Sequence, residues 1–259
     1  MAVLYTSKIL KGSALIDDTI LLLSSFDLLK STKENISSVW EENILVKSSR
    51  SRLKDVLVIL EERYLADPDL ASALHRFVKM NISHEILYPI LFFLTARSDP
   101  LIHDLFIDFV YEKKRMGMAF ISTGEVDQVI QQYVKEGKTT TQWSPETTIR
   151  ASQHFLALLR DFGILEGKGK KQFSPFIIPN ESFSFLSLYL HKQGLIGQQL
   201  VTTDEWKLLF LEKDLVERFY VDCEQDGYLI YNAAWPVIRI DYPASSLAEY
   251  ADVIINRTN

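Results

Sequence analysis

The sequence predicts a mainly α-helical protein, a helical bundle with helix-turn-helix and winged-helix units and short β-hairpins. Hydrophobic residues make up 47% of the 259 residues, which is enough to form a substantial core. Leucine-rich segments with apolar residues at helical spacing follow one another along the chain. Strand-like alternation is confined to two short stretches, around 164–173 and 228–240. These observations favour helices over a β-sandwich or an α/β sheet.

The segment 43–64 predicts a helix with an unusual distribution of charge. A serine at position 48 or 49 can accept the free N–H groups of the first turn. The apolar residues that then share one face are Leu53, Val56, Leu57, Leu60 and Tyr64, while polar residues, Arg63 among them, face the other way. Basic residues gather at the N-terminal end, namely Lys47, Arg50, Arg52 and Lys54. Each costs roughly 0.3–1 kcal/mol against the helix dipole. A bound polyanion would offset this cost; a solvated basic turn without a ligand is the alternative.

Two predicted helices, over residues 13–30 and 31–40, precede this one. Two helices followed by a longer basic helix is the order of a helix-turn-helix unit, although an ordinary three-helix packing unit has the same order. Farther along, Asp67-Pro68 and Asp99-Pro100 predict the starts of two more helices, because aspartate caps a helix and proline suits its first position. Between them a helix over 84–97 contains Pro89, which removes one backbone hydrogen bond.

The segment 122–173 predicts helix, turn, helix and hairpin in that order. Ser122 or Thr123 caps the first helix, and Ser144 caps a second helix that ends at Gly163. The core stripe of this second helix is predicted to be Thr148, Ala151, Phe155, Leu158, Leu159 and Phe162. Its opposite, polar face is predicted to hold Glu146, Arg150, Gln153, Ala157 and Arg160, with His154 beside them. A glycine- and lysine-rich tip then separates two strand ends, which completes the order of a winged helix. In such proteins the second helix can enter a major groove while the hairpin reaches phosphate. A winged helix that binds another protein is the alternative use.

Side chains suited to nucleic acid lie on both parts of this segment. Lys168, Lys170 and Lys171 are flexible point charges suited to phosphate, and Arg150 and Gln153 can reach base edges. We therefore predict one set of DNA-binding residues from the two basic segments. It consists of Lys47, Arg50, Arg52, Lys54, Arg150, Gln153, Arg160, Lys168, Lys170 and Lys171.

Residues 180–259 predict helices, the first of them capped by Asn180, then an apolar hairpin and a last helix in acidic surroundings. Eleven acidic and five basic residues lie in 202–259, which accounts for the whole net charge of −6. This region is expected to present a solvated acidic face or a docking surface for a basic partner, and not nucleic-acid contacts. We expect three regions: a helical domain with a helix-turn-helix-like unit (1–118), a winged-helix-like segment with a basic hairpin (119–179) and an acidic α+β segment (180–259).

Nothing in the sequence indicates an enzyme, a metal or a cofactor. The five histidines lack metal-ligand spacing, and Cys223 is the only cysteine, so neither an intrachain disulfide nor a cysteine-based metal site can form. No phosphate loop, dinucleotide-binding turn or nucleophile elbow is present. The longest apolar run, 86–94, is far below the roughly 18–20 residues that cross a bilayer, and it predicts a buried helix. The N-terminus has no signal-peptide form. We therefore expect a cytoplasmic protein without membrane contact.

Five motifs occur in order over most of residues 8–180. They are LKGSALIDDT, VWEENILVKSSRSRLKDVLVILEERY, LHRFVKM followed by ILYPILFFLTA, LFIDFVYEKKRMG, and SPETTIRASQHFLALLRDFGIL followed by the hairpin. In this order they resemble the BrxA family, core components of BREX bacteriophage-exclusion systems. The resemblance implies a largely helical fold with helix-turn-helix units and DNA binding without catalysis. It also implies work beside a methyltransferase and ATPases of the same system. The residues in the family's two polar-basic segments are Arg50, Arg52, Lys54, Thr148, Arg150 and Arg160.

Two main functions remain open at this point. The first is a non-enzymatic component of a phage-defence system that binds double-stranded DNA with low sequence selectivity through basic helix ends and a lysine-rich wing. The second is a protein–protein scaffold subunit of the defence complex, whose winged helix docks partners. The reversed-dipole helix and the lysine hairpin favour the first function, and the neutral charge of residues 1–201 favours the second. A regulator of its own operon is a third alternative.

Overall fold

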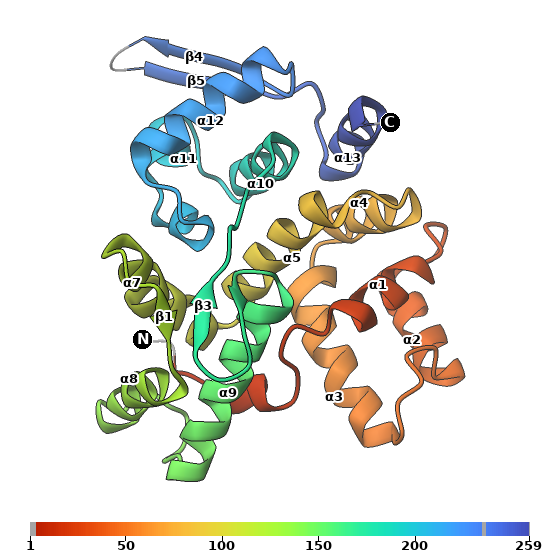
Figure 1. The fold of residues 1–259 in the computed structure, drawn as a ribbon. Coiled ribbons are helices and arrows are strands. Elements are labelled where there is room, and N and C mark those ends of the chain that lie inside the picture. Colours follow the sequence, from red (N-terminus) through yellow and green to blue (C-terminus); the bar gives the residue numbers. More distant parts are fainter. Residues whose placement is uncertain (1–3, 235–236, 259) are drawn as a thin grey trace. The chain divides into compact units, whose positions relative to one another are not determined.

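The computed structural model describes residues 4–234 and 237–258, which form helices with small antiparallel sheets, as the sequence predicts (Figure 1). Two compact units make up these residues, and each is assembled from three segments of the sequence. Unit 1 comprises the described residues of Met1–Thr19, Leu45–Arg63 and Phe92–Phe176. Unit 2 comprises those of Ile20–Ile44, Tyr64–Leu91 and Ile177–Asn259. The predicted boundaries near 118 and 179 stay a prediction.

Unit 1 contains short helices, two longer helices and a three-stranded sheet. Its elements are η1 (Ser7–Leu10), the start of α1 (Ile16–Ser24), α3 (Arg50–Leu60), the start of the π-helix η2 (Glu61–Leu65), the end of α5 (His84–Ser98), α6 (Pro100–Leu105), the π-helix η3 (Phe106–Tyr111), α7 (Glu112–Arg115), β1 (Phe120–Ile121), α8 (Thr123–Lys135), α9 (Pro145–Asp161), β2 (Leu165–Glu166) and β3 (Lys171–Phe173).

Unit 2 contains the remaining helices and a two-stranded ribbon. Its elements, besides the rest of α1, η2 and α5, are α2 (Thr32–Glu42), α4 (Pro68–Lys79), α10 (Asn180–Lys192), α11 (Gln198–Thr202), the 3₁₀-helix η4 (Asp204–Leu209), α12 (Lys213–Gln225), β4 (Ile230–Ala234), β5 (Val237–Asp241) and α13 (Leu247–Thr258). The Asp69 carboxylate on α4 accepts the backbone N–H groups of Leu247 and Ala248, so α4 supplies the cap of α13.

The helix starts that the sequence predicted are largely confirmed. The Ser49 hydroxyl accepts the Arg52 N–H, Asp67 and Asp99 cap α4 and α6, and Ser144 caps α9. One predicted cap is wrong. Asn180 is the first residue of α10 rather than its cap, and its amide donates to the Asp226 carboxylate at 2.7 Å. Pro179 occupies the cap position without a side-chain bond.

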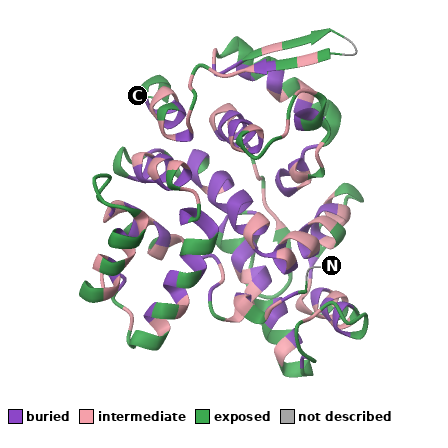
Figure 2. Cartoon of the chain, turned by 180° about the vertical axis from the view of Figure 1, so that it is seen from behind, coloured by how far each residue is buried: buried purple, intermediate pink, exposed green. Residues whose placement is uncertain are grey.

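The most deeply buried helices carry the apolar runs. The stretch 86–94 was predicted as a buried helix, and within α5 it is buried except at Tyr88, with Pro89 inside the helix. In α10 the run 182–188 is wholly buried, and the corresponding ribbon is mostly purple in Figure 2. Ser187 satisfies its buried hydroxyl against Tyr220 and Tyr242 at 2.7 and 2.6 Å. No helix in the described ranges is long and apolar enough to cross a bilayer.

Arg63 departs from the sequence prediction, which placed it on the polar face. It lies in the π-helix η2, and only 6% of it is exposed. A π turn advances the side chains by a different angle from an α turn, which alters the face that a residue takes. The guanidinium donates to the carbonyls of Ser13 and Gly12 at 2.7 and 3.0 Å, and more weakly to that of Ala14 at 3.3 Å. Its charge also lowers the pKa of Asp99, although burial raises that pKa more strongly.

We expect Arg63→Met to destabilise the chain by about 3 kcal/mol, because it leaves buried carbonyls without a donor and a buried carboxyl without its cation. Urea unfolding followed by circular dichroism measures the change. The matched control is Arg160→Met, since Arg160 is exposed and pairs with the adjacent Asp161. That control should shift the free energy of unfolding by less than about 0.5 kcal/mol. Equal midpoints for the two variants would contradict the role given to Arg63.

Candidate nucleic-acid interface

Helix α9 presents the two faces that its sequence predicts. The predicted core residues Thr148, Ala151, Phe155, Leu158, Leu159 and Phe162 are all buried. The predicted polar face is open to solvent: Arg150, Gln153 and Arg160 are exposed, and His154 is half-buried beside them. Ile149 is also exposed on this face, at 41%. Because these polar residues recur at a spacing of three and four, they lie along one side of the helix.

The predicted hairpin is present and belongs to a larger sheet. Strand β3 pairs antiparallel with β2, with Leu165 opposite Phe173, and also with β1, which the sequence did not predict. The tip requires Gly167, whose φ of +94° disfavours any side chain. Lys168 and Lys170 are exposed at this tip, and neither forms an ion pair within the described ranges.

Lys171 differs from the other two hairpin lysines. It is only 7% exposed, and its Nζ donates to the Gly167 carbonyl at 2.6 Å. The ammonium group therefore closes the tip turn from inside and is not a flexible charge like Lys168 and Lys170. This corrects the expectation that all three lysines are equivalent.

The basic start of α3 is only partly available to a ligand. Arg50 and Lys54 are exposed and Arg52 is half-exposed, but the Arg52 guanidinium donates to the Lys11 carbonyl. Lys47 is half-buried and pairs with Asp18 at 2.6 Å, so its charge is neutralised. Lys54 forms no ion pair with any residue that the structure describes.

The two basic segments meet at His154. Burial lowers the pKa of this imidazole, and the positive charges of Arg150 and Arg52 lower it further. Arg52 therefore lies within electrostatic range of the exposed face of α9, although it is far from Arg150 in the sequence. Helix η1 packs against α9, and the Lys11 carbonyl that binds Arg52 directly follows η1 (Figure 1). Tertiary packing thus brings Arg52 close to Arg150 and His154.

The hairpin tip lies farther along α9. From Arg150 to the helix end at Asp161 the axis advances about 16 Å at 1.5 Å per residue. One helical turn of duplex DNA is about 34 Å long, so one duplex is long enough to contact both places. Arg160, between them, pairs with Asp161 at 2.6 Å and contributes less net charge.

The described residues contain no cluster of three or more His, Cys, Asp or Glu side chains that could hold a metal ion. Lys114, which is not among the predicted site residues, makes a contact that the sequence did not predict: its Nζ lies 5.8 Å from the centre of the Phe173 ring. Burial lowers the pKa of Lys114. This contact ties α7 to the hairpin strand β3 and supports the hairpin's position.

A family comparison agrees with the order of these segments. The model of the BrxA family matches residues 4–188, which takes in α9, the hairpin and the start of α3. No curated protein matches the chain. Residues 189–259, with the ribbon and α13, lie outside the family match. Because the match extends over well more than half of the sequence, the chain belongs to the BrxA family.

Proposed function

We propose that this protein is a non-enzymatic DNA-binding component of a BREX phage-defence system. Membership of the BrxA family indicates a BREX-associated role. The observation that carries the DNA proposal is the exposed face of α9 with Arg150 and Gln153, against which η1 packs while the Lys11 carbonyl after η1 holds Arg52. In the free protein the positive charges of Arg52 and Arg150 repel each other. A polyanion bound between them offsets this repulsion.

The element order supports the same proposal. The chain order is α6 to α7, then β1, α8, α9, β2 and β3, with sheet order β1-β3-β2, and we interpret it as a winged helix. In that arrangement α9 is the helix that enters the major groove and the tip between β2 and β3 is the wing. Arg150 and Gln153 then face base edges, while Lys54, Lys168 and Lys170 contact phosphates. Few base-edge candidates imply low sequence selectivity.

A salt titration on duplex DNA tests the proposal. Four exposed cations at the surface (Lys54, Arg150, Lys168 and Lys170) imply a slope of about −3.6 in log affinity against log salt. Affinity should therefore fall about 100-fold between about 50 and about 200 mM salt. Lys168→Glu/Lys170→Glu should weaken binding to all sequences alike and flatten the slope by about 2 units. Fluorescence anisotropy with labelled duplexes measures both.

The matched control for this titration is Lys33→Glu/Lys192→Glu, two exposed lysines outside unit 1. It should bind DNA like the unaltered chain at every salt concentration. Affinity that does not change over the salt range, or an equal loss in the control, would falsify the proposed contact.

DNA binding should also depend on pH through His154. Its pKa lies below the ordinary 6.5 in the free chain, so it is neutral at pH 7. A nearby phosphate offsets Arg150 and Arg52 and raises that pKa, so the complex binds more protons than the free chain. Affinity should consequently rise about threefold from about pH 7.5 to about pH 6 at fixed salt. His154→Gln should remove this dependence, and an unchanged dependence in that variant contradicts the role of His154.

A scaffold subunit of the defence complex is the second candidate function, and the extent of internal ion pairing favours it. Many cations of unit 1 are already neutralised, as in Lys8–Glu62, Lys11–Asp55, Lys47–Asp18, Lys113–Glu125, Arg115–Glu112 and Arg160–Asp161. In this case the exposed face of α9 docks a protein. Arg150→Glu would then abolish co-purification with other BREX proteins, and the purified chain would not shift DNA.

A further inference from the structure

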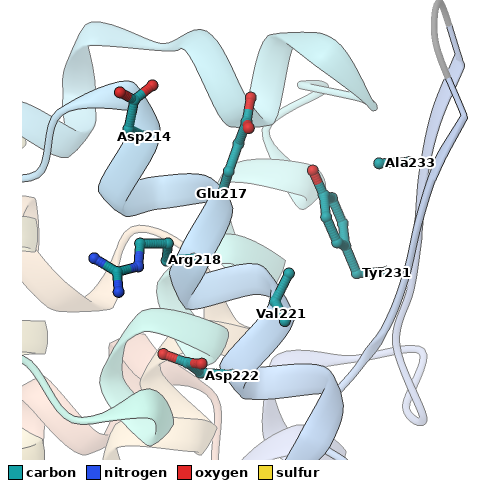
Figure 3. A pocket seen from close by; sticks show the side chains of 7 residues that line it. All are labelled: Asp214, Glu217, Arg218, Val221, Asp222, Tyr231 and Ala233. Carbon is teal, nitrogen blue, oxygen red and sulfur yellow. The ribbon is translucent and has the colours of Figure 1, made fainter.

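A groove lies between helix α12 and the outer edge of strand β4 (Figure 3). Its volume of about 530 Å³ is in the range of ligand-binding sites. Five side chains on one face of α12 line it, together with Tyr231 and Ala233 of β4. All of them lie beyond residue 188, outside the family match, and the proposed DNA contact does not use them.

The edge of β4 that borders this groove has backbone groups at Ala233 that no other described residue pairs. In an antiparallel pair, successive residues point their N–H and C=O alternately toward the partner strand and away from it. Tyr231, which is opposite Ile240 of β5, donates its N–H to the Glu224 carboxylate at 3.0 Å and therefore points away from β5. Ala233, two residues on, must point the same way. Ala233 is exposed and lines the groove, and no described residue forms a hydrogen bond with its outward N–H or C=O.

The opposite edge of the ribbon is covered instead. Ile238 of β5 stands opposite Ala233, so its carbonyl points outward from the other side. That carbonyl lies so close to Gly197 that a Cβ there would be 2.6 Å from it. The close approach blocks the β5 edge near Ile238. The edge at Ala233 is therefore the one available for another strand.

The groove carries an excess of negative charge over an apolar floor. Its carboxylates are Asp214, Glu217 and Asp222, against one arginine, Arg218. Asp214 and Asp222 form no ion pair with a described residue, and the Lys213 amine is 3.8 Å from Glu217. Burial raises the pKa of Tyr231, and the negative charge of Glu217 raises it further, so this carboxylate lies close to the strand. Figure 3 shows Glu217 and Val221 on the side of α12 that faces Tyr231.

We propose that this groove docks an extended basic segment of a partner protein, which adds to β4 as a third strand. The backbone of Ala233 supplies the hydrogen bonds, and lysine or arginine at alternate positions of the segment reaches the carboxylates of α12. Apolar residues between them cover Val221 and Tyr231. Charge complementarity identifies the partner as basic, because residues 202–259 hold the whole net charge of −6. A two-stranded ribbon is marginally stable alone, and a third strand completes it.

A labelled peptide of about six residues with alternating lysine and valine is the probe, since a typical strand has this length. Fluorescence anisotropy with the full chain should show saturable binding, about tenfold tighter than for the matching glutamate–valine peptide. Asp214→Asn/Glu217→Gln should weaken binding about fivefold. The matched control is Asp17→Asn/Glu42→Gln, two exposed carboxylates outside the groove, which should bind like the unaltered chain. Equal affinity for the basic and acidic peptides overturns the proposal.

The backbone contact is tested separately. Ala233→Pro removes the outward N–H and leaves the ladder to β5 intact, because proline is tolerated where the N–H faces away from the partner strand. It should weaken peptide binding about tenfold with an unchanged melting temperature. From the ligand side, methylating the backbone nitrogens of either the lysines or the valines removes the donors on one edge of the peptide. One of these two peptides should lose binding and the other should keep it.

Three results would contradict the docking of a basic partner segment. The first is that both methylated peptides bind like the parent, and the second is that Ala233→Pro has no effect. The third is concentration-dependent self-association of the chain that Ala233→Pro abolishes, which assigns the edge to a second copy. Lys168→Glu/Lys170→Glu should leave peptide binding unchanged, so the outcome is independent of the DNA proposal.

Discussion

The buried guanidinium of Arg63 is the interaction on which the arrangement of unit 1 depends. It gathers the carbonyls of residues 12–14 around one charge, and this fixes the chain between η1 and α1 against η2, directly after α3. Gly12 permits the approach, because a Cβ there would be 3.0 Å from the Ile59 side chain. The same segment holds the Lys11 carbonyl in place for Arg52, and Arg52 in turn lies near α9. A structural arginine thus positions a surface arginine.

Net charge is a poor guide to the surface of this protein. Residues 1–201 are neutral overall, yet internal ion pairs and hydrogen bonds neutralise or bury some of their cations and leave others exposed. Lys47 and Lys171 are used inside the structure, while Lys54, Lys168 and Lys170 remain exposed. Exposed cations that lack a carboxylate partner are the ones that can exchange counterions for phosphates. The acidic excess of unit 2 similarly matters where it lines a groove beside an open strand edge.

Much of the fold could be predicted from the sequence because its determinants are local. Ser49, Ser144 and Asp99 cap helices through bonds to N–H groups two or three residues away, and the apolar spacing in α9 fixes which face is buried. Of the candidate site, the exposed face of α9 and the two lysines of the hairpin tip could be placed in this way. Their convergence with Arg52 could not, because nothing local in the sequence indicates contact between segments so far apart.

By itself, the sequence determined the helices, their starts, the hairpins and the uneven distribution of charge, since each depends on neighbours along the chain. Only the tertiary structure decided which charges are exposed. Arg63 is buried because it lies in a π turn and three carbonyls distant in the sequence accept hydrogen bonds from its guanidinium. Lys171 is buried because its ammonium group donates to the Gly167 carbonyl and closes the hairpin turn. Asn180 is the first residue of α10 instead of its cap, and its amide donates to the Asp226 carboxylate. These outcomes depend on partners that packing brings together, and no local pattern contains them.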